Sequence, residues 1–308
     1  MKALVYKSTG SWYNVVDEAG KPWKARIKGI FRTEDLSSTN PIAVGDWVTL
    51  EADAEEDGIA AITAIDDRRN YITRQSPHNK NLHHIIAANL DQSLLICTLK
   101  DPRTSQGFID RFLVASEAYH VPAVLVFNKQ DTWRAKEQDH FELWRHMYGA
   151  AGYSVVAISV QTGYGIAEAR ELLRQKTTLL SGHSGVGKSS FLNAMFPKMD
   201  LRTGAVSAWS GKGMHTTTFA EMFDLDFGGR VIDTPGVREF GVVDVPPSEL
   251  AQYFPEMRQL MTGCQFNNCL HLNEPNCAVK AAIADGQMHQ QRYQSYQNIL
   301  DTIPKNTW

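Results

Sequence analysis

The segment Gly182-His183-Ser184-Gly185-Val186-Gly187-Lys188-Ser189 matches the phosphate-loop pattern G-x-x-x-x-G-K-[ST] at every fixed position. An apolar run, 178–180, precedes it, and an apolar segment with helical period begins after it at Phe191. In such a loop the glycines let backbone N–H groups turn inward around the α- and β-phosphates, aided by the N-terminus of the following helix. Lys188 is then expected to reach the β- and γ-phosphates, and Ser189 to ligate Mg²⁺. The residues expected to bind the nucleotide here are Gly182, His183, Ser184, Gly185, Val186, Gly187, Lys188, Ser189 and Ser190.

The sequence around this loop has the pattern of an α/β domain, which we place at 71–243. Short continuous apolar runs alternate with longer segments of helical period, which predicts βαβ units and a doubly wound parallel sheet. The expected strands are 93–99, 123–127, 153–158 and 178–180, and the expected helices are 107–119, 137–148 and 166–174.

The segments on either side of this domain are smaller. Residues 1–70 contain five short strand-like runs separated by turn signals, which indicates a small β-barrel. An OB-fold, a barrel that often binds oligonucleotides, is the commonest of this size. An SH3-like barrel that serves only as a protein contact module is the alternative. Residues 244–308 are expected to be mostly helical, with Ser248 as the N-cap of a short helix and a polar amphipathic helix over 278–300.

The composition is that of an ordinary soluble globular protein. The 308 residues include 31 Lys and Arg against 34 Asp and Glu, a formal net charge of −3, and 43% of them are hydrophobic. No apolar run is long enough to cross a membrane, and the N-terminus lacks the features of a signal peptide. We therefore expect a cytoplasmic protein that acts as a monomer and has no membrane partner. The slight net acidity argues against a surface that binds nucleic acid throughout.

The segment Asn128-Lys129-Gln130-Asp131 follows an expected strand and fits the base-reading motif N-K-x-D. A carboxylate at this position accepts hydrogen bonds from N1–H and N2–H₂ of guanine, which adenine cannot supply. We therefore expect Asn128, Lys129 and Asp131 to bind GTP rather than ATP. Ser159, at the end of the next expected strand, is the expected backbone contact beside the base.

The segment Asp233-Thr234-Pro235-Gly236 has the form D-x-x-G and follows another apolar run. Asp233 is expected to hold Mg²⁺ through water, and the Gly236 N–H to contact the γ-phosphate. Upstream, Thr217 is the residue that we favour to complete the Mg²⁺ shell, with Thr216 as the alternative. A threonine run before a strand is also simply favourable for β-structure.

The position after D-x-x-G is Val237, whereas Ras-like enzymes carry there a glutamine that orients the attacking water. Valine has no polar group for this role, so slow intrinsic hydrolysis is expected. His215, in the segment before the expected Mg²⁺ ligand, is our candidate for the catalytic residue, because a neutral imidazole can accept a proton from water or hold it in line. The alternative is that His215 is an ordinary loop histidine.

Three of the four cysteines lie close together, in the pattern Cys264-x₄-Cys269-x-His271-x₅-Cys277. Three thiolates and one imidazole make the Cys₃His set of a closed tetrahedral zinc site, and such soft ligands disfavour Mg²⁺. No ligand position is left open, so the metal should stabilise this segment and take no part in the chemistry. Cys97 lies in an apolar run and is expected to be a buried core thiol.

Basic residues in the barrel segment alternate with aromatic ones, a composition that suits phosphate contacts and base stacking. A second basic cluster is expected where the barrel meets the α/β domain. Such charge runs are more often solvated faces. The first set is Lys21, Lys24, Arg26, Lys28 and Arg32 with Trp23 and Phe31, and the second is Arg68, Arg69 and Arg74.

The order of the motifs is unusual. In common GTPases the phosphate loop comes first, whereas here N-K-x-D at 128 precedes the loop at 182, so the domain is circularly permuted. This order, the residues 182–190, the segment Gly213-Met214-His215-Thr216-Thr217 and the cysteine pattern resemble the bacterial small-ribosomal-subunit biogenesis GTPase family RsgA, also called YjeQ or EngC. The resemblance covers essentially the whole chain. Met214 departs from it, because the family usually carries Arg or Lys there.

The resemblance implies a GTPase that is stimulated by the ribosome and acts late in maturation of the small (30S) subunit. It implies an OB domain, a permuted GTPase domain and a domain with one structural Zn²⁺, with Mg²⁺ bound beside GTP or GDP and the small subunit and its rRNA as partners. Two other functions remain compatible with the residues. One is a GTP-dependent binding switch with little hydrolysis, and the other is an ATP-driven RNA remodeller.

Overall fold

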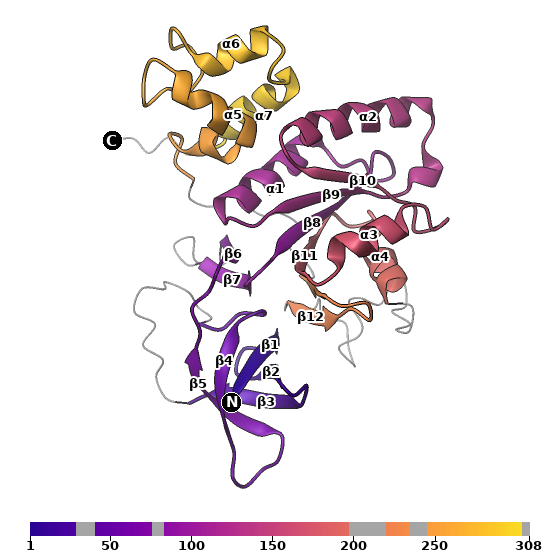
Figure 1. Ribbon diagram of the computed structural model, residues 1–308, viewed down its shortest axis with the longest axis vertical. Coiled ribbons are helices and arrows are strands. Elements are labelled where there is room, and N and C mark those ends of the chain that lie inside the picture. The colour runs from indigo at the N-terminus through magenta and orange to yellow at the C-terminus, as the bar shows by residue number, and fades with distance from the viewer. Residues whose placement is uncertain (29–40, 76–82, 197–219, 235–244, 304–308) are drawn as a thin grey trace.

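The computed structural model describes residues 1–28, 41–75, 83–196, 220–234 and 245–303. A β-barrel lies at one end of the molecule and a group of short helices at the other, with an α/β domain between them (Figure 1). Within the ranges just given, the structure has no helix with the length and apolarity needed to cross a membrane.

The N-terminal strands form a closed five-stranded barrel. Around the barrel the order is β1-β2-β3-β5-β4 and back to β1, and the β3–β5 pair is parallel while the other pairs are antiparallel. This is the connectivity of an OB-fold, so that expectation is confirmed and the SH3-like alternative is excluded. Small and branched side chains such as Ala3, Val5 and Ile62 fill the interior. The strands are β1 (Lys2–Ser8), β2 (Tyr13–Asp17), β3 (Pro22–Ile27), β4 (Trp47–Ala52) and β5 (Ile59–Ile65).

A β-hairpin, β6 (Tyr71–Gln75) and β7 (His83–Ala88), follows the barrel and was not expected from the sequence. It is attached to the barrel where the backbone N–H of Ala88 donates to the Val44 carbonyl, at 2.9 Å. Gly45 makes this approach possible, because it has a φ of +93° and a Cβ there would lie 2.1 Å from the Ala88 carbonyl oxygen.

The central domain is the doubly wound sheet that the sequence predicts. Its strand order is β10-β9-β8-β11-β13-β12, parallel except for β12, the short outermost strand of this domain, for which no bounds were predicted. The order reverses between β8 and β11, and ligands bind at such a switch point, outside the carboxyl ends of the strands. The strands are β8 (Gln92–Cys97), β9 (Ala123–Phe127), β10 (Ser154–Ala157), β11 (Thr177–Ser181), β12 (Glu221–Asp224) and β13 (Arg230–Asp233).

Helices cover both faces of this sheet (Figure 1). Helices α1 (Gln106–Ala118) and α2 (Ala135–Ala150) pack on one face, where Phe112 and Trp144 lie in one core cluster. Helices α3 (Ile166–Leu173) and α4 (Lys188–Met195) cover the other face in a separate cluster around Phe191. Both faces are therefore buried, which accounts for the continuous apolar strands.

The C-terminal part is helical, but its last helix is broken. The single helix expected over 278–300 is two, because Gly286 has a φ of +72° and the side chain of His289 accepts a hydrogen bond from the Gln291 N–H, at 3.2 Å, to begin a new helix. Ser248 is not a cap, since the first turn begins at Leu250. The elements are the 3₁₀ turns η2 (Leu250–Tyr253) and η3 (Met261–Gly263) and the helices α5 (Pro255–Leu260), α6 (Ala278–Ala284) and α7 (Gln290–Leu300).

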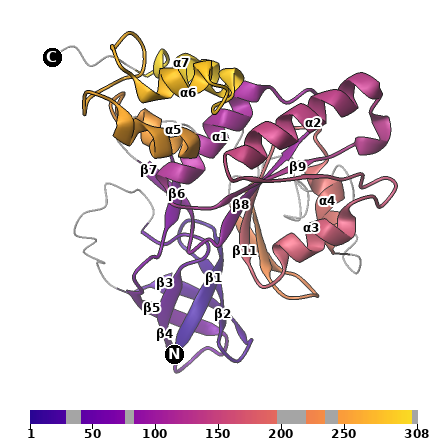
Figure 2. The same cartoon turned by 45° about the horizontal axis from the view of Figure 1, so that its top comes forward.

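A buried charge network joins this helical part to the α/β domain. Arg292 of α7 donates to Asp110 of α1 and, through Nε at 2.6 Å, to Glu256 of α5. Tyr148 also donates to Asp110, at 3.0 Å. The side chains of Arg292 and Asp110 are 1% and 0% exposed, so their charges are compensated by one another, by Glu256 and by hydrogen bonds within the protein. Figure 2 shows α5 and α7 against α1.

Removing one partner of such a pair leaves the other charge buried and uncompensated. We predict that Asp110→Ala lowers the free energy of unfolding by about 3 kcal/mol. Urea denaturation followed by circular dichroism measures this. The matched control is Arg145→Ala, which breaks an exposed pair with Glu142 and should cost less than about 0.5 kcal/mol. Equal small effects of the two substitutions would contradict the importance of the buried network.

Candidate nucleotide site and metal centre

The phosphate loop connects β11 to α4 and approaches its neighbours very closely. Gly182 has a φ of +147°, and a Cβ there would lie 2.6 Å from the Ile96 carbonyl oxygen of β8. Gly187 has a φ of +94°, and a Cβ there would lie 2.4 Å from Nδ2 of Asn128. Both positions therefore require glycine for conformation and for space.

The Lys188 side chain lies across the mouth of this loop. Its ammonium group donates to the carbonyl oxygens of Gly182, at 2.5 Å, and His183, at 3.0 Å. Burial lowers the pKa of Lys188, while the charge of Asp233 acts to raise it. The pKa of Asp233 is raised in turn, chiefly by burial, and the Lys188 ammonium opposes that shift. A cation and a carboxylate thus face each other at the place where phosphates and Mg²⁺ would enter.

The Asn128 amide connects the phosphate loop to the loop that reads the base. Asn128 Nδ2 donates to the Val186 carbonyl at 2.9 Å, and its Oδ1 accepts from the Val160 N–H at 3.3 Å. The side chain is buried, with 3% exposure. Three segments from different parts of the chain therefore meet at one amide group.

Asp131 and Ser159 form the base-reading end of the site. The Ser159 hydroxyl donates to Oδ1 of Asp131 at 2.5 Å and accepts from the Thr162 N–H at 3.1 Å. The Gln130 N–H also donates to the Ile158 carbonyl at 3.1 Å, so the 128–131 loop is attached to the end of β10. Ser159 is fully buried while Asp131 is exposed. The hydroxyl of Ser159 therefore orients the Asp131 carboxylate, which remains accessible to a ligand.

The structure thus gathers most of the sequence-predicted nucleotide residues at the carboxyl edge of the sheet. These are Asn128, Lys129, Asp131, Ser159, residues 182–190 and Asp233, which follow or end the strands β9, β10, β11 and β13. Three predicted residues, His215, Thr217 and Gly236, lie outside the described residues.

Sequence reasoning missed the contribution of the segment between β8 and α1. The Lys129 ammonium donates to the Asp101 carbonyl, and a Cβ on Gly185 would lie 3.3 Å from Pro102 Cδ. Phe108 of α1 packs against His183 of the phosphate loop, with ring centroids 3.6 Å apart and the ring planes tilted by 33°. No local motif marks these residues, because their role depends on the neighbouring strand order.

The cysteine cluster forms a second site, in the C-terminal part. The ligand atoms of Cys264, Cys269, His271 and Cys277 all lie within 4.8 Å of one another. His271 Nδ1 is 3.6 Å from the Cys264 sulfur and 3.3 Å from the Cys277 sulfur, and these two sulfurs are 4.0 Å apart. Zn²⁺ bonds of about 2.3 Å to sulfur and about 2.0 Å to nitrogen in a tetrahedron need separations of this size. The donor set therefore fits a closed structural zinc site.

The surroundings of the cluster support this assignment. Burial, together with the neighbouring thiols, raises the pKa of Cys269 to about 12, so a nearby cation is needed to favour its thiolate. Burial lowers the pKa of His271 and favours the neutral imidazole that can act as a ligand. The Tyr293 hydroxyl of α7 donates to the His271 carbonyl at 2.6 Å and fixes the loop. Cys97 is buried, and burial raises the pKa of its thiol, as expected of a core residue.

Comparisons with known proteins match nearly the whole chain. The model of the RsgA GTPase family matches residues 65–243, and that of the RsgA N-terminal domain matches residues 2–60. The protein named small ribosomal subunit biogenesis GTPase RsgA from Flavobacterium johnsoniae is 47% identical over 302 residues, which cover 98% of this chain and 93% of that protein. Its namesake from Bacteroides fragilis is 45% identical over 301 residues, which cover 98% and 96%.

Two solved structures share the fold. YjeQ from Thermotoga maritima superposes with a TM-score of 0.79 at 33% identity and covers 97% of each chain. YloQ, described as a circularly permuted GTPase, superposes with a TM-score of 0.76 at 29% identity and covers 99% of this chain and 96% of its own. The permuted order inferred from the motifs is therefore shared with a solved structure.

We predict that Gly187→Ala lowers the affinity for GDP by about 100-fold, because the added methyl group would displace the Asn128 amide. Titration with a fluorescent GDP analogue measures this. Gly149→Ala is the matched control, since its Cβ meets nothing within 4 Å on α2, and it should leave affinity unchanged. Wild-type affinity of the Gly187→Ala protein would show that the loop relaxes around a side chain.

The zinc assignment predicts the metal content of two variants. Cys277→Ser should lose most of its bound zinc and loosen the C-terminal helices, because one of four ligands is removed. Elemental analysis of the purified protein gives the zinc content, and limited proteolysis reports on the helices. Cys97→Ala, which lies outside the cluster, should retain the wild-type zinc content. A fully loaded Cys277→Ser protein would refute this ligand set.

Proposed function

The chain belongs to the RsgA family of GTPases, and we propose that it acts in late maturation of the small (30S) ribosomal subunit, hydrolysing GTP to GDP and phosphate at a rate that the subunit stimulates. Family membership makes it a GTP-hydrolysing enzyme. The observation that carries the proposal is the site at the switch point, where Asn128 joins the phosphate loop to the loop of Asp131. The relatives named above are small-subunit biogenesis GTPases.

The base-reading loop favours guanine over adenine. Asp131 offers a carboxylate that Ser159 already orients, so the N1–H and N2–H₂ donors of guanine can bind without rearrangement. Adenine has no donor there and would leave the carboxylate desolvated and unpaired, which costs about 1–3 kcal/mol or more. This geometry supports GTP as the substrate and argues against an ATP-driven RNA remodeller.

The phosphate side has the residues that a Mg²⁺-bound nucleotide requires. Ser189 follows Lys188 at the start of α4. Asp233 is the last residue of β13, the strand next to β11, so the side chains of Ser189 and Asp233 would both hold the ion. The bound Mg²⁺ would neutralise charge that develops on the phosphates. Lys188 would add its ammonium on the same side. We propose Thr217 as a further Mg²⁺ ligand and Gly236 as the γ-phosphate contact from the sequence motifs.

Water orientation is assigned to His215. Val237 replaces the usual glutamine, so intrinsic hydrolysis should be slow, and this favours an enzyme whose full activity needs a partner. The same valine supports the second candidate function, a GTP-dependent binding switch that hardly turns over. The difference between the two is whether the small subunit accelerates hydrolysis.

The partner surface that we propose is the exposed part of the barrel around β3. Arg26 lies over the exposed Trp12, with its guanidinium carbon 5.9 Å from the ring centroid, and Lys24 is exposed beside it. The basic surface is smaller than the sequence suggested, because Lys21 and Lys28 form ion pairs with acidic side chains of the barrel. These contacts would suit rRNA phosphates and one or two stacked bases.

Two arginines of the second basic cluster form ion pairs with carboxylates of this protein. Arg68 binds the buried carboxylate of Asp46 through two nitrogens, at 2.7 and 2.6 Å. Arg69 pairs with Asp91 at 2.7 Å. The Arg74 side chain, together with Arg32 and Phe31 of the first set, lies outside the part of the chain that is described. Arg68 is thus bound within the barrel domain, whereas Arg69 joins that domain to the start of the α/β sheet, and we leave both out of the proposed RNA surface.

The remaining assignments follow from this function. We propose the division into 1–70, 71–243 and 244–308, one structural Zn²⁺ in the last part, and a monomer that acts in the cytoplasm on the assembling subunit. The fit of the four ligand atoms supports the zinc ion.

The catalytic assignment predicts a selective loss. His215→Ala should keep its affinity for GDP within about twofold but reduce turnover in the presence of small subunits by about 100-fold, the usual contribution of a positioned acid or base. Phosphate release with and without purified small subunits, together with GDP titration, measures both effects. His146→Ala on α2, outside the site, is the control and should retain both. An unchanged stimulated rate in His215→Ala would eliminate this residue as the catalytic group.

A further inference from the structure

The barrel and the GTPase sheet meet edge to edge. Strand β1 of the barrel pairs antiparallel with β12, with Lys7 directly opposite Glu221. The Lys7 ammonium is 2.8 Å from the Glu221 carboxylate, and the two side chains are 19% and 24% exposed. The Tyr6 hydroxyl also lies 2.8 Å from both carboxylate oxygens of Asp224. Figure 1 shows β12 beside β1.

The same register continues to the nucleotide site. Glu221 is directly opposite Asp233 on β13, and Asp233 is opposite Leu180 on β11, two residues before the phosphate loop begins. Directly opposite residues project from the same face of a sheet, with Cβ atoms about 5 Å apart. Lys7, Glu221 and Asp233 therefore form a row of charged side chains that runs from the barrel to the carboxylate proposed to hold Mg²⁺. Strands lie about 4.8 Å apart, so Lys7 is only about 10 Å from Asp233.

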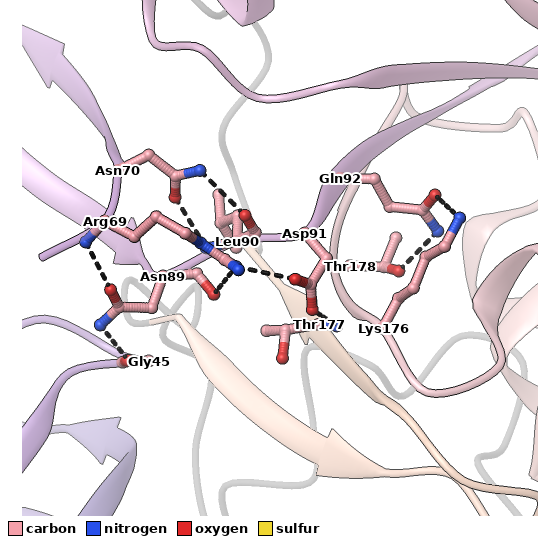
Figure 3. Close-up of polar contacts among 10 residues, drawn as sticks. All are labelled: Gly45, Arg69, Asn70, Asn89, Leu90, Asp91, Gln92, Lys176, Thr177 and Thr178. Atoms are coloured by element: carbon pink, nitrogen blue, oxygen red, sulfur yellow. Dashed lines mark hydrogen bonds and ion pairs between the residues drawn. The ribbon is translucent and has the colours of Figure 1, made fainter.

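A second attachment holds the barrel at the amino ends of the central strands β8 and β11 (Figure 3). Arg69 donates to Asp91 at 2.7 Å, and the other oxygen of Asp91 accepts from the Thr177 N–H at 2.7 Å, at the amino ends of β8 and β11. The Asn70 side chain exchanges two hydrogen bonds with the backbone of Leu90. With this contact fixed, displacement of the barrel would act on the pairing of β1 with β12.

We propose that Lys7 and Glu221 are a positioning pair through which occupancy of the barrel controls GTP turnover. This inference rests on the proposed function and identifies the contact by which the barrel would act on the nucleotide site. RNA bound to the barrel would set the position of β1, and the ion pair would transmit that position to β12. From there it reaches Asp233 on the neighbouring strand.

The alternative is that the pair only adds to stability. Partly exposed ion pairs usually contribute about 0–1 kcal/mol, so a purely structural role would leave stimulated turnover unchanged. The test must therefore separate turnover from nucleotide affinity, subunit binding and folding. A cycle of three variants provides this test. Lys7→Glu and Glu221→Lys each break the ion pair, and the double variant that carries both changes restores it with the charges exchanged.

We expect each single reversal to lower the rate of GTP turnover at saturating small subunits by about fivefold or more. The basal rate, the affinity for GDP, the affinity for the small subunit and the thermal midpoint should stay close to wild type. The double exchange should recover most of the stimulated rate. Lys2→Glu is the matched control. Lys2 lies on the same strand but pairs with Asp66 of the N-terminal domain and does not pair with β12, so this variant should keep full stimulation.

The outcomes distinguish this inference from the function on which it rests. If small subunits do not accelerate the wild type, the proposed function and this inference both fail. If they accelerate the wild type and the single reversals equally, only the inference fails. It also fails if the reversals weaken nucleotide or subunit binding in proportion to turnover, or if the double exchange does not restore the rate.

Discussion

The nucleotide site depends on the buried amide of Asn128. Its two hydrogen bonds, to the Val186 carbonyl and from the Val160 N–H, hold together three segments that are far apart in the sequence. The contact is so close that Gly187 cannot carry a side chain. Because these bonds are non-covalent, the site does not depend on the order in which the segments occur along the chain. A permuted chain can therefore build the same phosphate loop and base loop at the switch point of its sheet.

The outer parts of the molecule are joined to this site by polar contacts. Arg292 binds Asp110 on α1, the helix whose first turn also carries Phe108 against the phosphate loop. On the other side, Arg69 and Asp91 fix the barrel at the amino ends of the central strands, while Lys7 meets β12 at the edge of the α/β sheet. Hydrogen-bonded charges have a defined geometry that apolar packing lacks. Both outer domains are thus held in definite orientations toward the residues that bind the nucleotide.

The sequence predicts the parts of this molecule that local patterns determine. Strand Ala123–Phe127 was predicted at its observed bounds, because a buried parallel strand is a continuous apolar run. The four residues predicted as zinc ligands come together as their spacing suggests. The hairpin β6–β7 was missed and no bounds were predicted for β12, because these strands are short. The ion pair of Arg68 was also missed, because its partner Asp46 lies 22 residues away. The predicted roles of His215, Thr217 and Gly236 remain predictions.

The account is tested most directly by the rate of GTP hydrolysis of the wild-type protein, measured alone, with purified small ribosomal subunits and with purified large subunits. We expect slow turnover of the protein alone, because Val237 leaves the attacking water without the usual glutamine. Small subunits should accelerate turnover by at least about tenfold, and large subunits should not accelerate it. Equal rates in all three mixtures would contradict the central claim and favour a binding switch.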